Sequence, residues 1–199
     1  MKHIIIMSIL ASILGLFNSC FGTKIHGVPP LSIITNGNNK RAKMPEGKLL
    51  MVECSKHGTM IQPIFACKAE LEEDGTATCA IWQGDAFRKY RIDPSILDEM
   101  REVIKSHEMY KYYNSYSDPN ILDGTMWSFS AHFYKDRSND PDKAYLGNME
   151  TMYSSGSNAG PSDNGIYELI KIAEKAVEGA EFLNYTNHEW ERVEEPTVR

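Results

Sequence analysis

The 199-residue sequence lacks the residue spacings that bind metal ions and the basic segments that bind nucleic acid. Its four cysteines include no Cys-x-x-Cys pair, and its six histidines include no His-x-x-x-His pair, so no zinc site is predicted. Acidic side chains outnumber basic ones, 27 to 21, whereas a protein that binds nucleic acid normally carries a basic stripe. We therefore predict no metal, no cofactor and no nucleic-acid partner.

Long apolar segments are also missing, with one exception at the N-terminus. Lys2 and His3 precede 14 uncharged residues, Ile4 to Phe17. A helix of that length spans roughly 21 Å, which is less than the roughly 30 Å of a bilayer's hydrocarbon layer. A short basic head and a short apolar core are typical of a signal peptide, which we assign to residues 1–19.

The apolar segment ends at Phe17-Asn18-Ser19-Cys20, which resembles the lipobox of bacterial lipoproteins. In that family the cysteine receives a diacylglycerol thioether and becomes the new N-terminus, so the resemblance implies that Cys20 is lipidated and that the membrane is a partner through this anchor. Phe21 follows, and the first acidic residue is Glu46. In such lipoproteins an aspartate directly after the cysteine signals retention in the inner membrane, and an acidic cluster there signals export to the surface. Both signals are absent here, so the resemblance favours the periplasmic face of the outer membrane. A secreted soluble protein with an incidental cysteine is the alternative.

The rest of the chain is expected to form one domain between two irregular segments. Residues 20–47 are rich in glycine and proline and have no apolar period, which is typical of a flexible linker. Residues 48–183 have the common length of a single domain. Residues 184–199 are predicted to form a polar tail. Beyond the lipobox, the domain resembles uncharacterised cell-envelope lipoproteins in a general way.

Short strands are predicted first in this domain, at Leu49–Ser55, Ile64–Leu71, Thr76–Trp82 and Phe87–Ile92. Ala69 and Leu71 belong to one alternating apolar set, and Ala77 and Cys79 belong to another. The two sets share one face of the sheet only if the loop contains three residues, 73–75, with a left-handed Gly75. This register makes Cys67 and Cys79 diagonal neighbours, too far apart for a disulfide. We predict both thiols to be reduced and buried, while the pairing of Cys54 stays open.

Two amphipathic helices and a clear strand complete the prediction. Asp93-Pro94 begins a helix that ends near His107, and a second helix begins at about Ile166. Residues 127–133 alternate between apolar and polar, as in a half-buried strand, and a short strand at 151–155 is a candidate partner. We expect an α+β domain with a two-layer architecture, in which an antiparallel sheet carries the two amphipathic helices on one face.

Two segments are candidate ligand-binding sites. The loop from Ser154 to Gly165 lies before a helix N-terminus, which can present backbone N–H groups to an anion, and we select Ser157 and Asn158 in it as ligand-binding residues. The loop has no Gly-Lys-Ser/Thr ending, and Asp163 suits a helix cap, so a capped turn is the alternative. Tyr112 and Tyr113 belong to a tyrosine-rich segment that could form an aromatic surface for binding an envelope protein, a peptide or a glycan. The alternative is that these side chains pack under the edge of the sheet.

Two further patterns are weak. Residues 136–142 alternate oxygen-bearing side chains as a calcium loop does, but Pro141 stands where glycine is needed and Gly147 stands where glutamate is needed. Spacing also permits a Cys-His nucleophile pair, for instance Cys54 with His57 or His132, although the cysteines lie in strand patterns that favour burial. We assign no catalytic residue. The expected function is that of a lipid-anchored, non-enzymatic binding or accessory module, and the alternative is a cell-envelope hydrolase with a Cys-His site.

Overall fold

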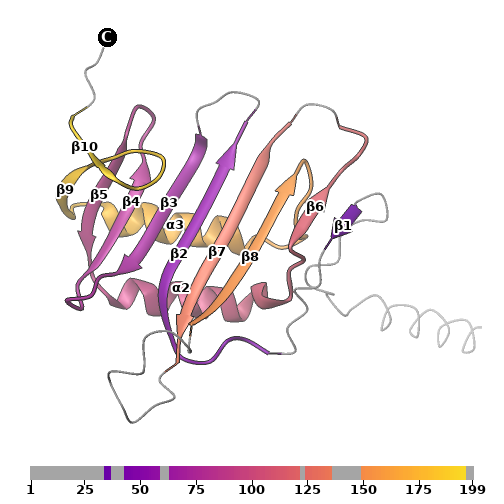
Figure 1. Ribbon diagram of the computed structural model, residues 1–199, viewed down its shortest axis with the longest axis horizontal. Coiled ribbons are helices and arrows are strands. Elements are labelled where there is room, and N and C mark those ends of the chain that lie inside the picture. Colours follow the sequence, from indigo (N-terminus) through magenta and orange to yellow (C-terminus); the bar gives the residue numbers. More distant parts are fainter. Residues whose placement is uncertain (1–33, 37–42, 59–62, 122–123, 136–148, 196–199) are drawn as a thin grey trace, which may run out of the picture.

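A computed structural model describes residues 34–36, 43–58, 63–121, 124–135 and 149–195. The strands form one 10-stranded sheet in the order β1-β6-β8-β7-β2-β3-β4-β5-β9-β10 (Figure 1). In chain order the elements are β1 (Ile34–Asn36), β2 (Lys48–His57), β3 (Pro63–Leu71), β4 (Ala77–Trp82), β5 (Phe87–Ile92), helix α2 (Ser95–Ser106), the 3-10 helix η1 (Met109–Lys111), β6 (Ser115–Ser117), β7 (Met126–Tyr134), β8 (Met149–Ser157), helix α3 (Gly165–Val177), β9 (Glu181–Thr186) and β10 (Arg192–Val193).

The molecule belongs to the α+β class, but the prediction of an antiparallel sheet is wrong at one edge. Strands β6 and β8 pair in parallel, with Tyr116 opposite Gly156, whereas the other described pairs are antiparallel. The reason is the position of β8, which lies between β6 and β7 in the sheet. Strands β6 and β7 are consecutive in the chain, lie on either side of β8 and run in opposite directions. Because β8 is also antiparallel to β7, β8 and β6 run in the same direction.

The β3–β4 hairpin has the predicted register. Ala69 lies opposite Cys79 and Leu71 lies opposite Ala77. Gly75 has a φ of +83°, a conformation that L side chains rarely adopt. The three-residue loop is therefore confirmed, and the alternating apolar residues of both strands share one face.

The two helices pack against each other and against the middle of the sheet. Helix α2 contacts β2 and β3, helix α3 contacts β2 to β5, and Figure 1 shows both helices behind the sheet. At the start of α2, the carboxylate of Asp93 accepts a hydrogen bond of 2.8 Å from the backbone N–H of Ser95. The core residues of the helices are Leu97, Met100 and Ile104 of α2 and Leu169, Ala173 and Val177 of α3.

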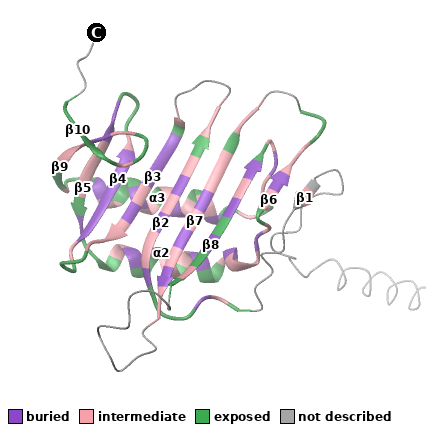
Figure 2. Cartoon of the chain, in the orientation of Figure 1, coloured by how far each residue is buried: buried purple, intermediate pink, exposed green. Residues whose placement is uncertain are grey.

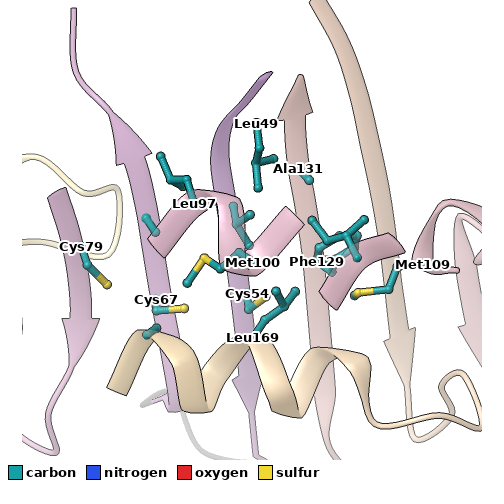
Figure 3. Close-up of a cluster of buried hydrophobic side chains, with 14 of the residues drawn as sticks. Leu49, Cys54, Cys67, Cys79, Leu97, Met100, Met109, Phe129, Ala131 and Leu169 are labelled. Carbon is teal, nitrogen blue, oxygen red and sulfur yellow. The ribbon is translucent and has the colours of Figure 1, made fainter. Parts of the chain in front are cut away.

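The core lies between the helices and the sheet. Along β7, Phe129, Ala131 and Phe133 are buried, while the residues between them are half-buried on the other face (Figure 2). This is the alternation that a strand imposes on successive side chains. Figure 3 shows side chains from β2, β3, β7 and both helices meeting in one cluster. We call the face of the sheet opposite the helices the open face.

The structure differs from the expected organisation at both ends of the domain. Strand β1 lies within the segment predicted as a linker and pairs with β6. Strand β9 crosses the boundary predicted at residue 183, because Asn184 to Thr186 continue its pairing with β5. Cys20 and the signal segment lie outside the described residues. None of the helices in the described ranges is long and apolar enough to span a bilayer.

Candidate functional site

A cavity of about 350 Å³ lies beside the loop that joins β8 to α3. We call it the α3 cavity. The end of β2, the start of β7, the loop itself and the first turns of α3 each contribute part of its wall. The lining residues are Lys56, Thr125, Trp127, Asn158, Ala159, Gly160, Pro161, Asp163, Asn164, Ile166, Tyr167 and Ile170.

Hydrogen bonds to β7 and to the segment before it hold the first part of this loop. The backbone N–H of Asn158 donates to the carbonyl of Thr125 at 2.8 Å, and its side-chain amide donates to the carbonyl of Ile121 at 3.2 Å. The indole N–H of Trp127 donates to the carbonyl of Ala159 at 2.6 Å. Asn158 has a φ of +58°, which asparagine tolerates better than most residues. The loop is therefore built into the sheet.

Asp163 organises the end of the loop and the first turn of α3. Its Oδ1 accepts a hydrogen bond of 2.8 Å from the backbone N–H of Gly165 and a second one from the hydroxyl of Tyr112. Burial, followed by the contact with Asp163, raises the pKa of Tyr112 well above its ordinary value, so the phenol stays protonated and donates. Asp163 thus shapes the turn before α3, but it is not the predicted cap, because the N-cap residue is Asn164, which makes no side-chain cap hydrogen bond.

His107 joins this group from the end of α2. Its Nδ1 lies 3.5 Å from Oδ1 of Asp163, and its Nε2 lies 3.1 Å from a carboxylate oxygen of Glu168. Two buried atoms of the group, Nδ1 of His107 and Oδ2 of Asp163, have no hydrogen-bond partner among the described residues. A buried polar atom without a partner costs about 1–3 kcal/mol, so this buried group at the start of α3 is incompletely hydrogen-bonded.

The structure brings together only part of the predicted ligand site. Asn158 lines the α3 cavity, and Tyr112, 1% exposed, supports it from beneath through Asp163. Ser157 points to the open face instead. It follows the buried Gly156 on β8, and successive side chains of a strand point to opposite faces of the sheet. Tyr113 is half-buried, with its ring centroid 5.8 Å from that of Tyr116. The expectation that Tyr112 belongs to a surface for a partner is therefore wrong, since its side chain is enclosed by the core.

Sequence reasoning missed the cavity residues that come from other elements. The sequence predicts Trp127 as a strand residue and His107 as the end of a helix, and Lys56 lies one residue beyond a predicted strand. No local pattern marks them, because Lys56 and Trp127 reach the cavity only when β2 and β7 pair, and His107 meets Asp163 only when α2 packs beside α3. The tendency of buried polar side chains to find partners is the one general signal for His107.

A second cavity, of about 500 Å³, contains Ser157 and lies beside β2, β7 and β8. Seven of its eleven lining residues carry a hydroxyl group, and the hydroxyls of Ser55 and Ser128 are 2.8 Å apart. The lining residues are Ser55, His57, Ser115, Tyr116, Met126, Trp127, Ser128, Tyr153, Ser155, Gly156 and Ser157.

The Cys-His pairs considered above do not form in the described structure. Cys54 is fully buried on the helix side of the sheet, whereas His57 and His132 lie on the open face, an odd number of positions from Cys54 or from its partner Phe129. Burial lowers the pKa of His132. Cys54 lies opposite Cys67 instead, and both thiols, like that of Cys79, are free.

Residues 136–142, with their calcium-like spacing, lie outside the described residues. Within the described ranges, no group of three or more His, Cys, Asp or Glu side chains is placed to hold a metal ion. In comparisons with known proteins, the chain matches no family model, no curated protein and no solved structure. The function is therefore argued from the cavity and from the N-terminal segment.

Proposed function

We propose that this protein is a lipid-anchored, non-enzymatic binding module of the cell envelope, and that the α3 cavity is its ligand site. The observation that carries the proposal is the cavity of about 350 Å³ beside the predicted loop, with apolar side chains of β7 and α3 and the polar side chains of Lys56, Asn158 and Asp163 in its wall. Cavities with mostly apolar walls and a few converging polar groups are the usual places where proteins bind small molecules.

A two-layer architecture with both helices on one face is part of the same proposal. Helices α2 and α3 shield the core, so the loop before α3 lies at the edge of the helix layer. Trp127 of β7 supports that loop, while Ile166 and Ile170 of α3 form the apolar wall opposite. A ligand in this position contacts both layers without entering the core.

Lipid at Cys20 would keep the module at a membrane. The lipobox-like run Phe17-Asn18-Ser19-Cys20 supports this part of the proposal, and two or three acyl chains give stable attachment where one gives only marginal binding. The periplasmic face of the outer membrane is the proposed location. The ligand site would then act on molecules in the periplasm.

Cell fractionation and intact-mass spectrometry test the anchor. We expect the wild-type protein in the membrane fraction, with a mature mass that begins at Cys20 and includes acyl chains. The Cys20→Ser variant should no longer be found in the membrane fraction. The Cys79→Ala variant, which lacks a buried thiol, should still be found there. An unmodified Cys20 in the mature wild-type protein would show that the anchor is absent.

Ligand-detected NMR with a library of amino acids, short peptides and sugars tests the cavity. We expect compounds that bind the wild-type protein not to bind the Ile170→Trp variant, because the larger side chain fills the cavity. Lys171→Trp is the matched control, since the neighbouring residue is exposed and does not line the cavity. Binding that survives Ile170→Trp, or a library without a single binder, would contradict the assignment of the site. Conversion of a compound would contradict the non-enzymatic part.

A further inference from the structure

The second cavity, of about 500 Å³, lies on the open face, across the sheet from the helices. We call it the open-face cavity. Successive side chains of a strand point to opposite faces of the sheet. Cys54 of β2 and Phe129 of β7, which lie opposite each other, are buried against the helices, so the positions next to them point to the open face. The side chains that reach the cavity from this face are those of Ser55, His57, Ser115, Met126, Ser128, Tyr153, Ser155 and Ser157.

Serines from four adjacent strands lie side by side in the wall of this cavity. Ser55 of β2 lies opposite Ser128 of β7. Ser128 in turn lies opposite Ser155 of β8, and Ser155 lies opposite Ser115 of β6. Neighbouring strands are about 4.8 Å apart, so this row of hydroxyls is roughly 14 Å long. That is the length of a short oligosaccharide rather than of a single sugar.

The serine hydroxyls offer hydrogen bonds of both kinds. A hydroxyl has one proton to donate and two lone pairs that accept. The single hydrogen bond of 2.8 Å between Ser55 and Ser128 uses one of their two protons and leaves the other for a ligand. The hydroxyl of Ser155 lies 3.4 Å from the carbonyl of Asn114, which is longer than an ordinary hydrogen bond between oxygens. A ligand that donates and accepts at close intervals, as a sugar does, matches this wall.

Among the described residues that line the open-face cavity there is no Asp, Glu, Lys or Arg. An ion that leaves water for such a wall loses hydration without gaining an opposite charge. Nucleic acid binds through contacts of Lys and Arg with its phosphates, which this wall does not provide. The wall therefore favours an uncharged ligand.

A peptide or a protein partner fits the open-face cavity less well than a sugar does. An added peptide strand needs a free sheet edge, whereas β2, β7 and β8 each have a neighbouring strand on both sides. The core of a protein–protein interface is rich in apolar and aromatic side chains, whereas seven of the eleven lining residues here carry a hydroxyl group.

An exposed aromatic ring lies beside the serines. Tyr153 precedes Ser155 by two residues on β8, so both side chains point to the same face, and Tyr153 is 51% exposed. The face of an aromatic ring carries partial negative charge, which attracts the weakly polarised C–H groups on the face of a sugar ring. Met126, 56% exposed, adds an apolar contact on the other side of the serines.

We infer that the open-face cavity binds an uncharged oligosaccharide, a disaccharide or a trisaccharide in size. Its hydroxyls form hydrogen bonds with Ser128 and Ser155, and one of its sugar rings stacks on Tyr153. About 500 Å³ lies within the range of small-molecule pockets, roughly 300–1,000 Å³. This inference goes beyond the proposed function, because it adds a second site on the other face of the sheet.

Calorimetric titration with a panel of trisaccharides tests the inference. Cellotriose, maltotriose and triacetylchitotriose are uncharged, trigalacturonate is anionic, and chitotriose, which has ammonium groups in place of the acetamides, is cationic. We expect at least one uncharged trisaccharide to bind and the charged ones to bind about tenfold more weakly or not at all. No binding of any uncharged trisaccharide at millimolar concentration would overturn the inference, and so would a charged trisaccharide that binds as tightly as the best uncharged one.

Two substitutions place the sugar on this face. Tyr153→Ala removes the stacking ring and should weaken binding by about tenfold, whereas Tyr167→Ala removes a similarly exposed ring on α3 and should not. Ser155→Trp fills the middle of the cavity and should abolish binding. Thr151→Trp is the matched control, because Thr151 is exposed on the same face of β8 but does not line the cavity.

Thermal unfolding checks that each variant folds, and Tyr153→Ala provides an independent result if Ser155→Trp does not. Unchanged binding in Tyr153→Ala together with a folded Ser155→Trp variant that still binds would overturn the inference.

The two proposed sites are tested independently. A sugar whose binding survives Ile170→Trp but is lost in Ser155→Trp occupies the open-face cavity, and the α3 cavity is then judged by the other compounds of the library. A sugar that is lost in Ile170→Trp and still binds the Ser155→Trp variant occupies the α3 cavity, which would contradict the open-face site and support the proposed function.

Discussion

At the scale of single residues, the three described thiols behave as small apolar side chains. Cys54, Cys67 and Cys79 are each at most 1% exposed and lie in the core on the helix side of the sheet (Figure 3). A hydrogen bond to Cys54, followed by burial, raises the pKa of Cys67, and burial raises that of Cys79. Because the thiolate is the reactive form, these groups are poor nucleophiles at neutral pH.

Alkylation measures this property directly. We expect iodoacetamide to leave all three thiols unlabelled in the folded protein at pH 7.5 and to label them rapidly in guanidinium chloride. Mass spectrometry after digestion reads each site. Fast labelling of one thiol in the folded protein would instead indicate an exposed, activated cysteine and would favour the hydrolase alternative.

Gly156 shows how closely β8 approaches its neighbours. A Cβ atom there would lie 2.1 Å from the carbonyl oxygen of Ala159 and 2.2 Å from Nε1 of Trp127, the two atoms whose hydrogen bond holds the cavity loop. We expect Gly156→Ala to lower the free energy of unfolding by about 1–3 kcal/mol, measured by urea denaturation with tryptophan fluorescence. Gly58→Ala is the control, because among the described residues its Cβ would meet nothing closer than 3.4 Å. Equal midpoints for both variants would contradict the close approach.

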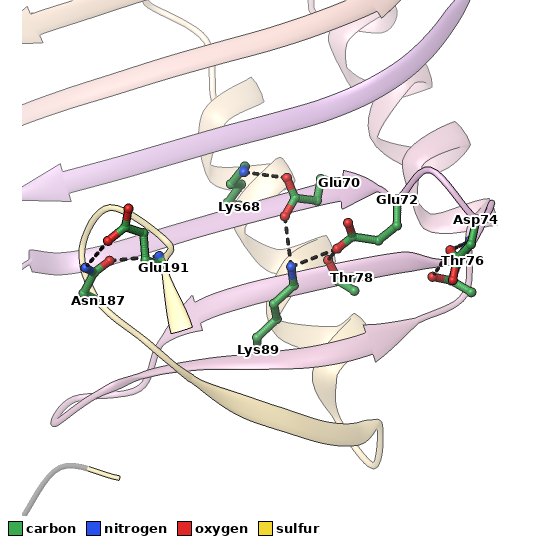
Figure 4. Close-up of polar contacts among 9 residues, drawn as sticks. All are labelled: Lys68, Glu70, Glu72, Asp74, Thr76, Thr78, Lys89, Asn187 and Glu191. Atoms are coloured by element: carbon green, nitrogen blue, oxygen red, sulfur yellow. Dashed lines mark hydrogen bonds and ion pairs between the residues drawn. The ribbon is translucent and has the colours of Figure 1, made fainter. Parts of the chain in front are cut away.

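At the scale of elements, an ion network ties β3 to β5 across the open face (Figure 4). The ammonium of Lys89 lies 3.1 Å from Glu70 and 2.8 Å from Glu72, and Lys68 lies 2.5 Å from the second oxygen of Glu70. The hydroxyl of Thr78 on β4 donates to Glu72 at 2.8 Å. These groups are only partly exposed, so solvent screens them less than it screens a surface pair.

The network should make stability depend on pH. Burial alone would raise the pKa of Glu70, but Lys68 and Lys89 outweigh burial and lower it. A carboxyl whose pKa is lower in the folded state stabilises the protein at pH values above its pKa in the unfolded state, about 4.5. This contribution is lost as the pH falls through the pKa of the folded state. We expect Glu70→Gln to cost about 1 kcal/mol at pH 7 and nothing at the acid end of a urea-denaturation series.

Glu99→Gln is the control for that series. Glu99 is an exposed carboxylate of α2, so its substitution should follow the wild-type curve at every pH. A constant difference between the wild-type protein and Glu70→Gln from pH 7 down to acid would show that the lost stability does not come from the charge of Glu70.

At the scale of the whole molecule, the C-terminal hairpin completes the sheet. Strand β9 covers the edge of β5, and the ring centroid of Trp190, in the turn after β9, lies 5.0 Å from that of Phe87. The side-chain oxygen of Asn187 accepts hydrogen bonds of 2.9 Å from the N–H groups of Glu189 and Glu191 and so shapes the turn (Figure 4 shows its contact with Glu191). The hairpin is therefore part of the domain.

Truncation tests that conclusion. A chain that ends at Ala180 loses β9 and β10, exposes the edge of β5 and uncovers Phe87, so we expect a loss of about 3 kcal/mol or more and aggregation through the open edge. A chain that ends at Glu195 keeps every described contact and should melt as the full chain does. Thermal unfolding and light scattering measure both, and equal melting of the two chains would mean that the hairpin adds nothing.

Local patterns in the sequence determined the elements and one detailed register. Period-two alternation located β7, and Gly75 set the loop that places Ala69 opposite Cys79. These features are decided within a few residues, because they depend on backbone conformation and on which side chains share a face. The loop before α3 was found for the same reason, together with Asn158.

The tertiary structure alone decided which distant side chains meet. Strands β1, β6 and β10 contain only two or three residues each, too few to show a period, and they exist because longer strands offer them an edge. Lys56 and Trp127 reach the cavity only after β2 pairs with β7, and His107 meets Asp163 only after α2 packs against α3. A local pattern records the conformation of one segment, whereas a binding site depends on the packing of several, and packing energy is shared over the whole core.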